Sequence, residues 1–171
     1  MTRRTRKLFL VAELATAVVL LVAVHAWRTH DLLPTDERTA APSFELPLLE
    51  GGTVRSADLA GRPTVLYFFA PWCKVCAASA HQLRWFSRLA SDRAGVVLIA
   101  LDWRSSGEVE DYVARHEFGL PVALGDVSMA SAWRIRGYPT YYVLDSSNRI
   151  AAVDVGVSTF PGLLLRTLGA D

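Results

Sequence analysis

The sequence predicts an α/β fold with a mostly parallel central sheet, joined to one N-terminal transmembrane helix. Three observations support this prediction: a long apolar run near the N-terminus, a later alternation of apolar strands with helical segments, and a pair of cysteines where one strand meets a helix. Alternating strands and helices favour parallel pairing, because each crossover helix covers one face of the sheet.

The N-terminus combines positive charge with hydrophobicity. Basic side chains within residues 1–7 precede an apolar run over residues 8–27, which as a helix would be roughly 30 Å long, enough to cross a bilayer. The positive-inside rule keeps the basic residues in the cytoplasm and exports the chain that follows. We therefore expect a single-pass anchor in a bacterial inner (cytoplasmic) membrane, with the folded domain in the periplasm or outside the cell.

A cleaved signal peptide is the competing interpretation of this segment. Glu13 shortens the uninterrupted apolar stretch to residues 14–24, and Val24-His25-Ala26 offers small residues at plausible cleavage positions. Both interpretations export the domain to an oxidising compartment, where disulfides persist.

The exported part divides into a linker and one domain. Residues 28–42 carry mixed charge, Pro34 and no periodicity, so we expect a linker there and a folded domain over residues 43–171. The last two strands are expected to pair antiparallel. The expected elements are a hairpin of strands at 44–46 and 53–55, a helical turn at 56–59, strands at 64–70, 96–101, 122–124, 140–144 and 150–155, and helices at 73–90, 107–116, 129–133 and 159–168.

The only two cysteines, Cys73 and Cys76, stand three positions apart at a strand-to-helix junction. We expect Cys73 at the start of the helix, where unpaired backbone amides and the neighbouring charge of Lys74 lower the pKa of its thiol from roughly 8.5. Cys76, one turn further along, is expected to be less exposed and to resolve a mixed disulfide formed by Cys73. A reversible dithiol is favoured over a structural staple, because a bridge that closes so short a loop constrains the unfolded chain little.

Composition argues against metal and nucleic-acid functions. A zinc site needs two ligands besides the cysteines, and the candidates His81 and His116 show no ligand spacing. The net charge of +1 gives no reason to propose a nucleic-acid partner. We therefore expect no metal and no organic cofactor.

Three segments of the chain carry a family resemblance: Ala41–Leu46, Tyr67–Cys76 and Gly137–Thr140. Through them the chain resembles the thioredoxin superfamily, in the membrane-anchored bacterial branch that includes TlpA, ResA and the DsbE-like cytochrome c maturation thioredoxins. Its layout looks closest to the protein disulfide oxidoreductases of the suppressor-for-copper-sensitivity D type. The resemblance covers roughly Ala41–Leu168 and implies a thioredoxin-like fold, with a central mixed sheet flanked by helices and an N-terminal hairpin extension.

The resemblance also implies roles for individual residues. Pro139 corresponds to a cis-proline that faces the dithiol, and it leaves the backbone of Tyr138 free to pair with a bound peptide. Trp72 would belong to the apolar platform that receives the substrate. The implied activity is thiol:disulfide exchange with protein substrates, by a monomer that also meets a membrane electron donor or acceptor.

Departures from the family pattern bear on mechanism. Tyr67 stands where thioredoxin has a buried aspartate, which leaves the base for Cys76 unidentified. Lys74 and Tyr138 replace acidic residues that are typical of the reductive branch, a hint toward oxidase or isomerase use. The direction of electron flow therefore stays open.

Two other functions for the same cysteine pair remain as alternatives. A copper-binding or copper-delivery protein could hold Cu(I) with the pair, although no methionine or histidine cluster accompanies it. A thiol peroxidase is disfavoured, because Ala70 stands where the related peroxiredoxins place a threonine.

Overall fold

The computed structural model describes the backbone of residues 3–35 and 38–170, and the side chains of the first helix from residue 10 onward. It divides into two compact units, Met1–Asp31 and Leu32–Asp171. The first unit consists of helix α1 (Arg3–Thr29). Within it, Leu10–Thr29 has a mean hydropathy of 2.0, and its length and composition suffice to cross a membrane. A signal sequence meets the same criterion.

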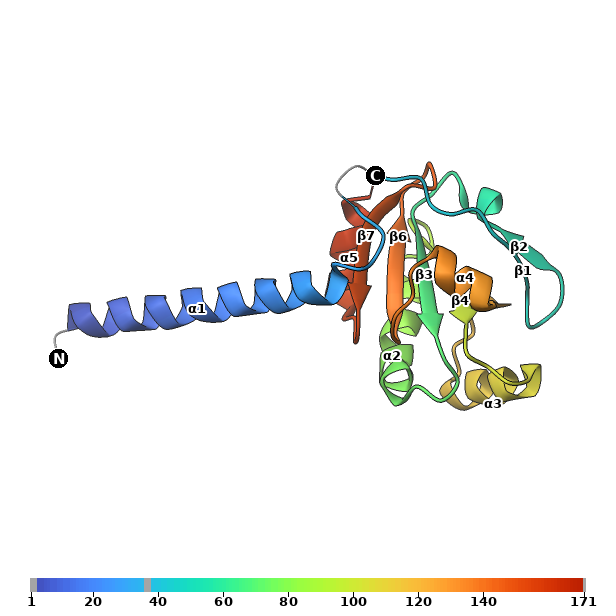
Figure 1. Cartoon of the computed structure of the whole chain (residues 1–171), viewed down its shortest axis with the longest axis horizontal. Coiled ribbons are helices and arrows are strands. Elements are labelled where there is room, and N and C mark those ends of the chain that lie inside the picture. The colour runs from blue at the N-terminus through green and yellow to red at the C-terminus, as the bar shows by residue number, and fades with distance from the viewer. Residues whose placement is uncertain (1–2, 36–37, 171) are drawn as a thin grey trace. The chain divides into compact units, whose positions relative to one another are not determined.

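The second unit is built on a five-stranded mixed sheet with the order β5-β4-β3-β6-β7 (Figure 1). Strands β3, β4 and β5 run parallel, whereas β6 pairs antiparallel with both β3 and β7. Every residue of β3 and β4 is buried, as expected of apolar central strands covered on both faces. The strands are β3 (Thr64–Phe69), β4 (Gly95–Ala100), β5 (Val122–Leu124), β6 (Thr140–Leu144) and β7 (Ile150–Val155).

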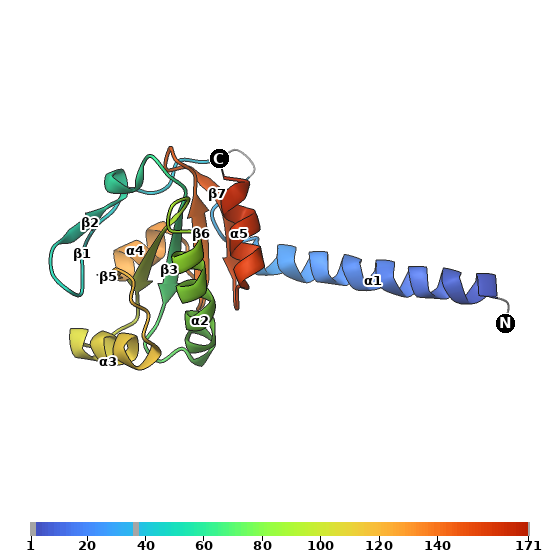
Figure 2. The same cartoon turned by 180° about the vertical axis from the view of Figure 1, so that it is seen from behind.

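Helices cover both faces of the sheet, as Figures 1 and 2 show from opposite sides. One apolar core lies beneath α2, α3 and α5 and includes both cysteines. A second core lies on the other face beneath α4 and the chain that precedes the hairpin. The helices are α2 (Lys74–Leu89), α3 (Ser106–His116), α4 (Val127–Ala132) and α5 (Phe160–Leu168). The predicted thioredoxin-like α/β fold is therefore confirmed.

The N-terminal hairpin extension is also present. Strands β1 (Glu45–Pro47) and β2 (Thr53–Arg55) pair antiparallel, and the 3-10 turn η1 (Ser56–Leu59) follows them. The turn between the strands uses Gly51 and Gly52, whose positive φ values of 94° and 85° favour glycine. The hairpin is thus set by local sequence.

The chain before the hairpin differs from the expected solvated linker. Leu32 is only 5 % exposed and packs into the second core, and the Leu33 N–H donates a hydrogen bond to the Tyr142 hydroxyl at 3.3 Å. Two adjacent leucines among charged residues form no helical or strand period, so the sequence pattern does not reveal this packing. The packed domain begins before residue 43.

The boundaries of the elements follow their capping residues. Strands β5, β6 and β7 match the predicted ranges residue for residue. Helix α4 begins two residues earlier than the predicted turn at Met129, because the Asp126 side chain caps it by accepting the Met129 N–H at 2.9 Å. Thr159 similarly caps α5.

Candidate functional site

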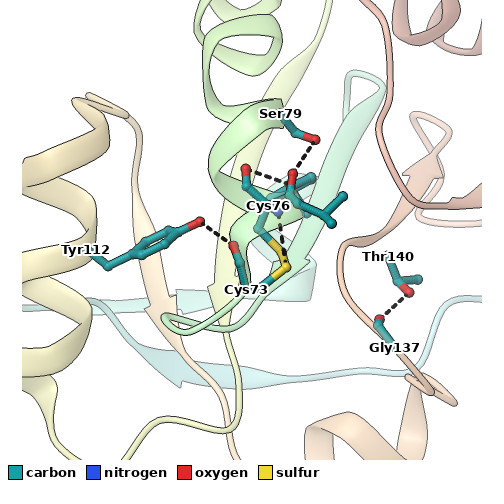
Figure 3. Close-up of a disulfide and its surroundings, with 8 residues drawn as sticks. Cys73, Cys76, Ser79, Tyr112, Gly137 and Thr140 are labelled. Carbon is teal, nitrogen blue, oxygen red and sulfur yellow. Dashed lines mark hydrogen bonds between the residues drawn. A yellow bond between two sulfur atoms is a disulfide. The ribbon is translucent and has the colours of Figure 1, made fainter.

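Cys73 and Cys76 are joined by a disulfide at the beginning of α2, with their Cα atoms 5.3 Å apart (Figure 3). Cys73 is the N-cap of the helix: its backbone is extended, and its Sγ accepts the N–H of Cys76 at 3.1 Å. A negative charge on this sulfur would therefore meet a helix amide and the positive end of the helix dipole. The predicted position of Cys73 at the helix start is confirmed.

The two cysteines have different surroundings. Cys73 is 5 % exposed and borders a surface pocket, whereas Cys76 has no exposed surface. A tyrosine hydroxyl holds each backbone carbonyl: Tyr112 donates to the Cys73 oxygen and Tyr67 to the Cys76 oxygen, both at 3.4 Å. The local backbone is thus anchored to α3 on one side and to β3 on the other.

Tyr67 lies in a row of aromatic rings beneath α2. Its ring stacks between those of Phe69 and Tyr141, each with a centroid distance of 6.5 Å. Burial raises the pKa of Tyr67 well above its usual range. The Tyr67 hydroxyl therefore keeps its proton at neutral pH and acts as a donor, so it cannot serve as the base for Cys76.

Two of the residues expected to receive the substrate, Trp72 and Tyr138, are in contact. The rings of Trp72 and Tyr138 meet edge to face at 5.7 Å, and Trp72 is 61 % exposed. The Tyr138–Pro139 peptide bond is cis. Figure 3 shows Gly137 and Thr140 of this segment on the opposite side of the disulfide from Tyr112. Trp72 and Tyr138 therefore form one continuous aromatic surface.

An acidic residue, Asp102, borders this surface. Asp102 follows β4 with a left-handed φ of 51°. Burial, and then the charge of Asp102, raise the pKa of Tyr138. The carboxylate and the phenol are thus electrostatic neighbours at the carboxyl end of the parallel strands.

A pocket of about 370 Å³ opens beside Cys73 on the side of α3. It contains the predicted Lys74 together with two α3 residues that the sequence did not single out, Tyr112 and Arg115. The lining residues are Pro71, Trp72, Cys73, Lys74, Ala77, Tyr112, Arg115 and His116.

The pocket brings His116 to the dithiol, although the sequence pattern considered it only as a poor zinc ligand. Its ring lies 4.6 Å from that of Tyr112. Among residues 10–35 and 38–170, whose side chains the structure describes, no group of three or more histidine, cysteine or acidic residues could hold a metal ion. The site is therefore a dithiol beside a basic and aromatic pocket.

Comparison with known proteins identifies the family. A model of the AhpC/TSA family matches residues 38–153, which is most of the chain. The chain belongs to the AhpC/TSA family. The match includes the dithiol, the aromatic surface and the pocket on α3.

Two relatives are named as a thioredoxin-like protein and a thiol-disulfide oxidoreductase. The thioredoxin-like protein YneN of Bacillus subtilis is 24% identical over 149 residues, covering 83% of this chain and 88% of its own length. The thiol-disulfide oxidoreductase ResA of Bacillus cereus is 26% identical over 121 residues, covering 70% and 69% respectively. These relatives confirm the predicted resemblance to the thioredoxin-like branch that includes ResA.

A solved structure agrees with the fold. The thiol:disulfide interchange protein of Chlorobium tepidum superposes with a TM-score of 0.70 at 26% identity, covering 77% of this chain and 95% of that chain. This AhpC/TSA family member therefore combines the fold of thiol-disulfide oxidoreductases with a closed Cys73–Cys76 pair.

Proposed function

We propose that the protein is a membrane-anchored, extracytoplasmic thiol:disulfide oxidoreductase that exchanges disulfides with protein substrates. One observation carries this proposal: the disulfide between Cys73 and Cys76 sits at a helix start, with the Cys73 sulfur accepting a helix amide and bordering a surface pocket. The names of ResA and the Chlorobium tepidum protein support the same activity.

Exchange in the reducing direction follows from the asymmetry of the pair. The Cys73 thiolate attacks one sulfur of a substrate disulfide, and the other substrate sulfur leaves as a thiolate that takes up a proton. The Cys76 thiolate then attacks the Cys73 sulfur of the mixed disulfide and releases the second substrate thiol. Two electrons pass to the substrate and the Cys73–Cys76 disulfide forms; oxidation of a substrate reverses these steps.

Trp72, Tyr138 and Pro139 are proposed to hold the substrate chain. Among the residues that the structure describes, no hydrogen bond uses the backbone N–H or C=O of Tyr138. These groups are free to pair with an extended peptide, and Trp72 offers an exposed apolar surface next to them. Lys74 is proposed to tune the Cys73 thiolate.

The location of the domain is proposed from the first helix. Its apolar segment suits a single-pass anchor in the inner membrane, with the catalytic domain in the periplasm or outside. We propose that the protein acts as a monomer and exchanges electrons with a membrane donor or acceptor. Cleavage as a signal peptide would leave the chemistry unchanged.

A copper-binding or copper-delivery protein is the second candidate, because an exported thiolate pair suits Cu(I). Among the side chains that the structure describes, no group of three or more histidine, cysteine or acidic residues could hold a metal ion, although His116 lines the pocket beside Cys73. Titration of the reduced protein with Cu(I) separates the two functions: tight binding together with negligible disulfide exchange would favour copper handling.

The test of the proposed function uses the full chain in detergent. The reduced protein is mixed with a peptide disulfide, and peptide thiols are trapped and counted against time. We expect exchange well above the background of free dithiol at the same concentration, with loss of the protein dithiol in equal amount. Exchange at the background rate would overturn the proposal.

A further inference from the structure

The pocket beside Cys73 has walls from two helices. Lys74 and Ala77 come from α2, while Tyr112, Arg115 and His116 come from α3. Cys73 also lines the pocket, so a group bound there would lie next to the sulfur that we propose to react. Figure 3 shows Tyr112 approaching the disulfide from the side opposite Gly137 and Thr140. Gly137–Thr140 do not line the pocket, and Trp72 lies between the pocket and Tyr138.

The pocket carries positive charge that the protein does not neutralise. Lys74 and Arg115 are both exposed, and neither makes an ion pair within the described part of the chain. The Arg115 Nε donates to the backbone oxygen of Asp111 at 3.1 Å, which positions the guanidinium without cancelling its charge.

None of the acidic side chains of α3 and its C-cap lines this pocket. Glu110 and Asp111 line a different pocket, and the other two form ion pairs. Glu117 pairs with Arg84 at 2.7 Å, and Glu108 pairs with Arg104 at 3.1 Å. The His116 ring packs against Tyr112 and Phe118 and lines the pocket. An anion from outside would meet two unpaired cations.

We propose that this pocket binds a carboxylate of the disulfide substrate, and that the enzyme prefers protein disulfides with an aspartate or glutamate beside the cysteine that Cys73 attacks. The inference rests on the proposed function and adds its substrate class. Oppositely charged groups raise the encounter rate and fix the orientation of a partner more than they add affinity. The preference should therefore appear in kcat/KM.

The test compares two peptide disulfides that differ only in glutamate or glutamine beside one cysteine. With the full-length reduced protein, we expect the glutamate peptide to react about fivefold faster at low salt, the size of one exposed ion pair. The advantage should shrink toward unity at 1 M salt, where the screening length is about 3 Å. Equal rates at low salt would overturn the inference and leave the proposed function standing, whereas exchange with neither peptide would overturn both.

Variants of Arg115 test whether the preference for glutamate arises in this pocket. Arg115→Gln should reduce the glutamate preference about threefold, and Arg115→Glu should reverse its sign, since each removes or inverts a charge at an exposed position. Arg88→Gln is the matched control, because Arg88 is an exposed arginine in the last turn of α2 and does not line the pocket. An unchanged preference in Arg115→Glu, with a native circular dichroism spectrum, would overturn the inference.

Glutathione disulfide serves as a second test substrate, because it carries carboxylates near its sulfurs but has no extended peptide chain. Comparing it with the glutamate peptide shows whether the pocket favours small anionic disulfides or protein disulfides. A dependence on Arg115 that appears with the glutamate peptide supports the assignment to protein substrates. A dependence confined to glutathione disulfide would overturn that assignment.

Discussion

Cys73 and Cys76 lie within one turn of the start of the same helix, yet their surroundings differ. Cys73 caps α2, borders the pocket and has its carbonyl held by Tyr112 from α3. Cys76 has no exposed surface, and its carbonyl is held by Tyr67 from the centre of the sheet. A spacing of three residues at a helix start therefore places one sulfur beside a surface pocket and encloses the other, which supports the attacking and resolving roles that we propose for them. The proposed mechanism depends on this difference.

The largest expected effect comes from removing the outer sulfur. Cys73→Ser should reduce exchange with peptide disulfides to the uncatalysed background, because a serine hydroxyl does not attack disulfides at neutral pH. Serine is a good N-cap, so the variant should keep the fold. Trapping of peptide thiols over time measures the rate. Exchange near the wild-type rate would show that Cys76 can replace Cys73, and the contrast between them would fail.

Removing the exposed aromatic beside Cys73 is expected to have the next largest effect. Trp72→Ala should lower kcat/KM for a peptide disulfide by about three- to tenfold, because an exposed tryptophan at a binding surface contributes roughly 1 kcal/mol or more. Reaction with dithiothreitol, which lacks a peptide chain, should change less. Trp85→Ala is the control, since Trp85 is similarly exposed on α2 and outside the pocket. Equal losses in both variants would argue against a substrate surface at Trp72.

The positive charge of Lys74 should stabilise the Cys73 thiolate. Lys74→Gln should raise the pKa of the Cys73 thiol, which destabilises the reduced form and makes the disulfide less oxidising. For one exposed charge at a helix start, the reduction potential should fall by about 10–20 mV. Equilibration against glutathione with thiol trapping measures the potential. A rise in potential would contradict the proposed role of Lys74.

The smallest effect concerns the tyrosine that supports Cys73. Burial raises the pKa of Tyr112 to about 12. The folded protein therefore keeps this proton at a pH where the unfolded chain, with an ordinary value of about 10, has lost it. Stability from Tyr112 is complete below pH 10 and falls as the pH rises toward 12.

Tyr112→Phe should make the loss of stability above pH 10 less steep, because the other buried tyrosines keep their own contributions. The free energy of unfolding at neutral pH should change by about 1 kcal/mol or less. Denaturation of the oxidised protein at pH 8 and pH 11 measures both values, and use of the disulfide form excludes titration of the thiols. A variant that loses stability between these pH values as steeply as the wild type would show that Tyr112 does not contribute.

The sequence predicted those features that depend on neighbouring residues. The apolar run of β3, the helix start at Cys73 and the paired strands β6 and β7 each follow from a local pattern, and the structure has them. The cis peptide at Pro139 was expected from the family resemblance and is present. The role of Tyr67 was only partly foreseen: its place beneath Cys76 was expected, but the hydrogen bond to the Cys76 carbonyl needed the packed structure.

Features that depend on distant segments were not predictable from one sequence. Tyr112 and Arg115 reach the dithiol only because α3 packs beside α2, and nothing in their local pattern distinguishes them from an ordinary helix surface. Leu32 packs into the core from a segment whose charges suggested a solvated linker. Hydrophobic periodicity does not mark Tyr112 or Arg115 as residues near the dithiol.

The most direct test of the account is to trap the mixed disulfide. The reduced Cys76→Ser variant is mixed with a peptide disulfide, and the adduct is mapped by mass spectrometry under non-reducing conditions. The account predicts a stable one-to-one adduct through Cys73, which the wild-type protein resolves with release of the peptide. Absence of an adduct in this variant, together with an adduct through Cys76 in Cys73→Ser, would contradict the assigned roles of the two cysteines.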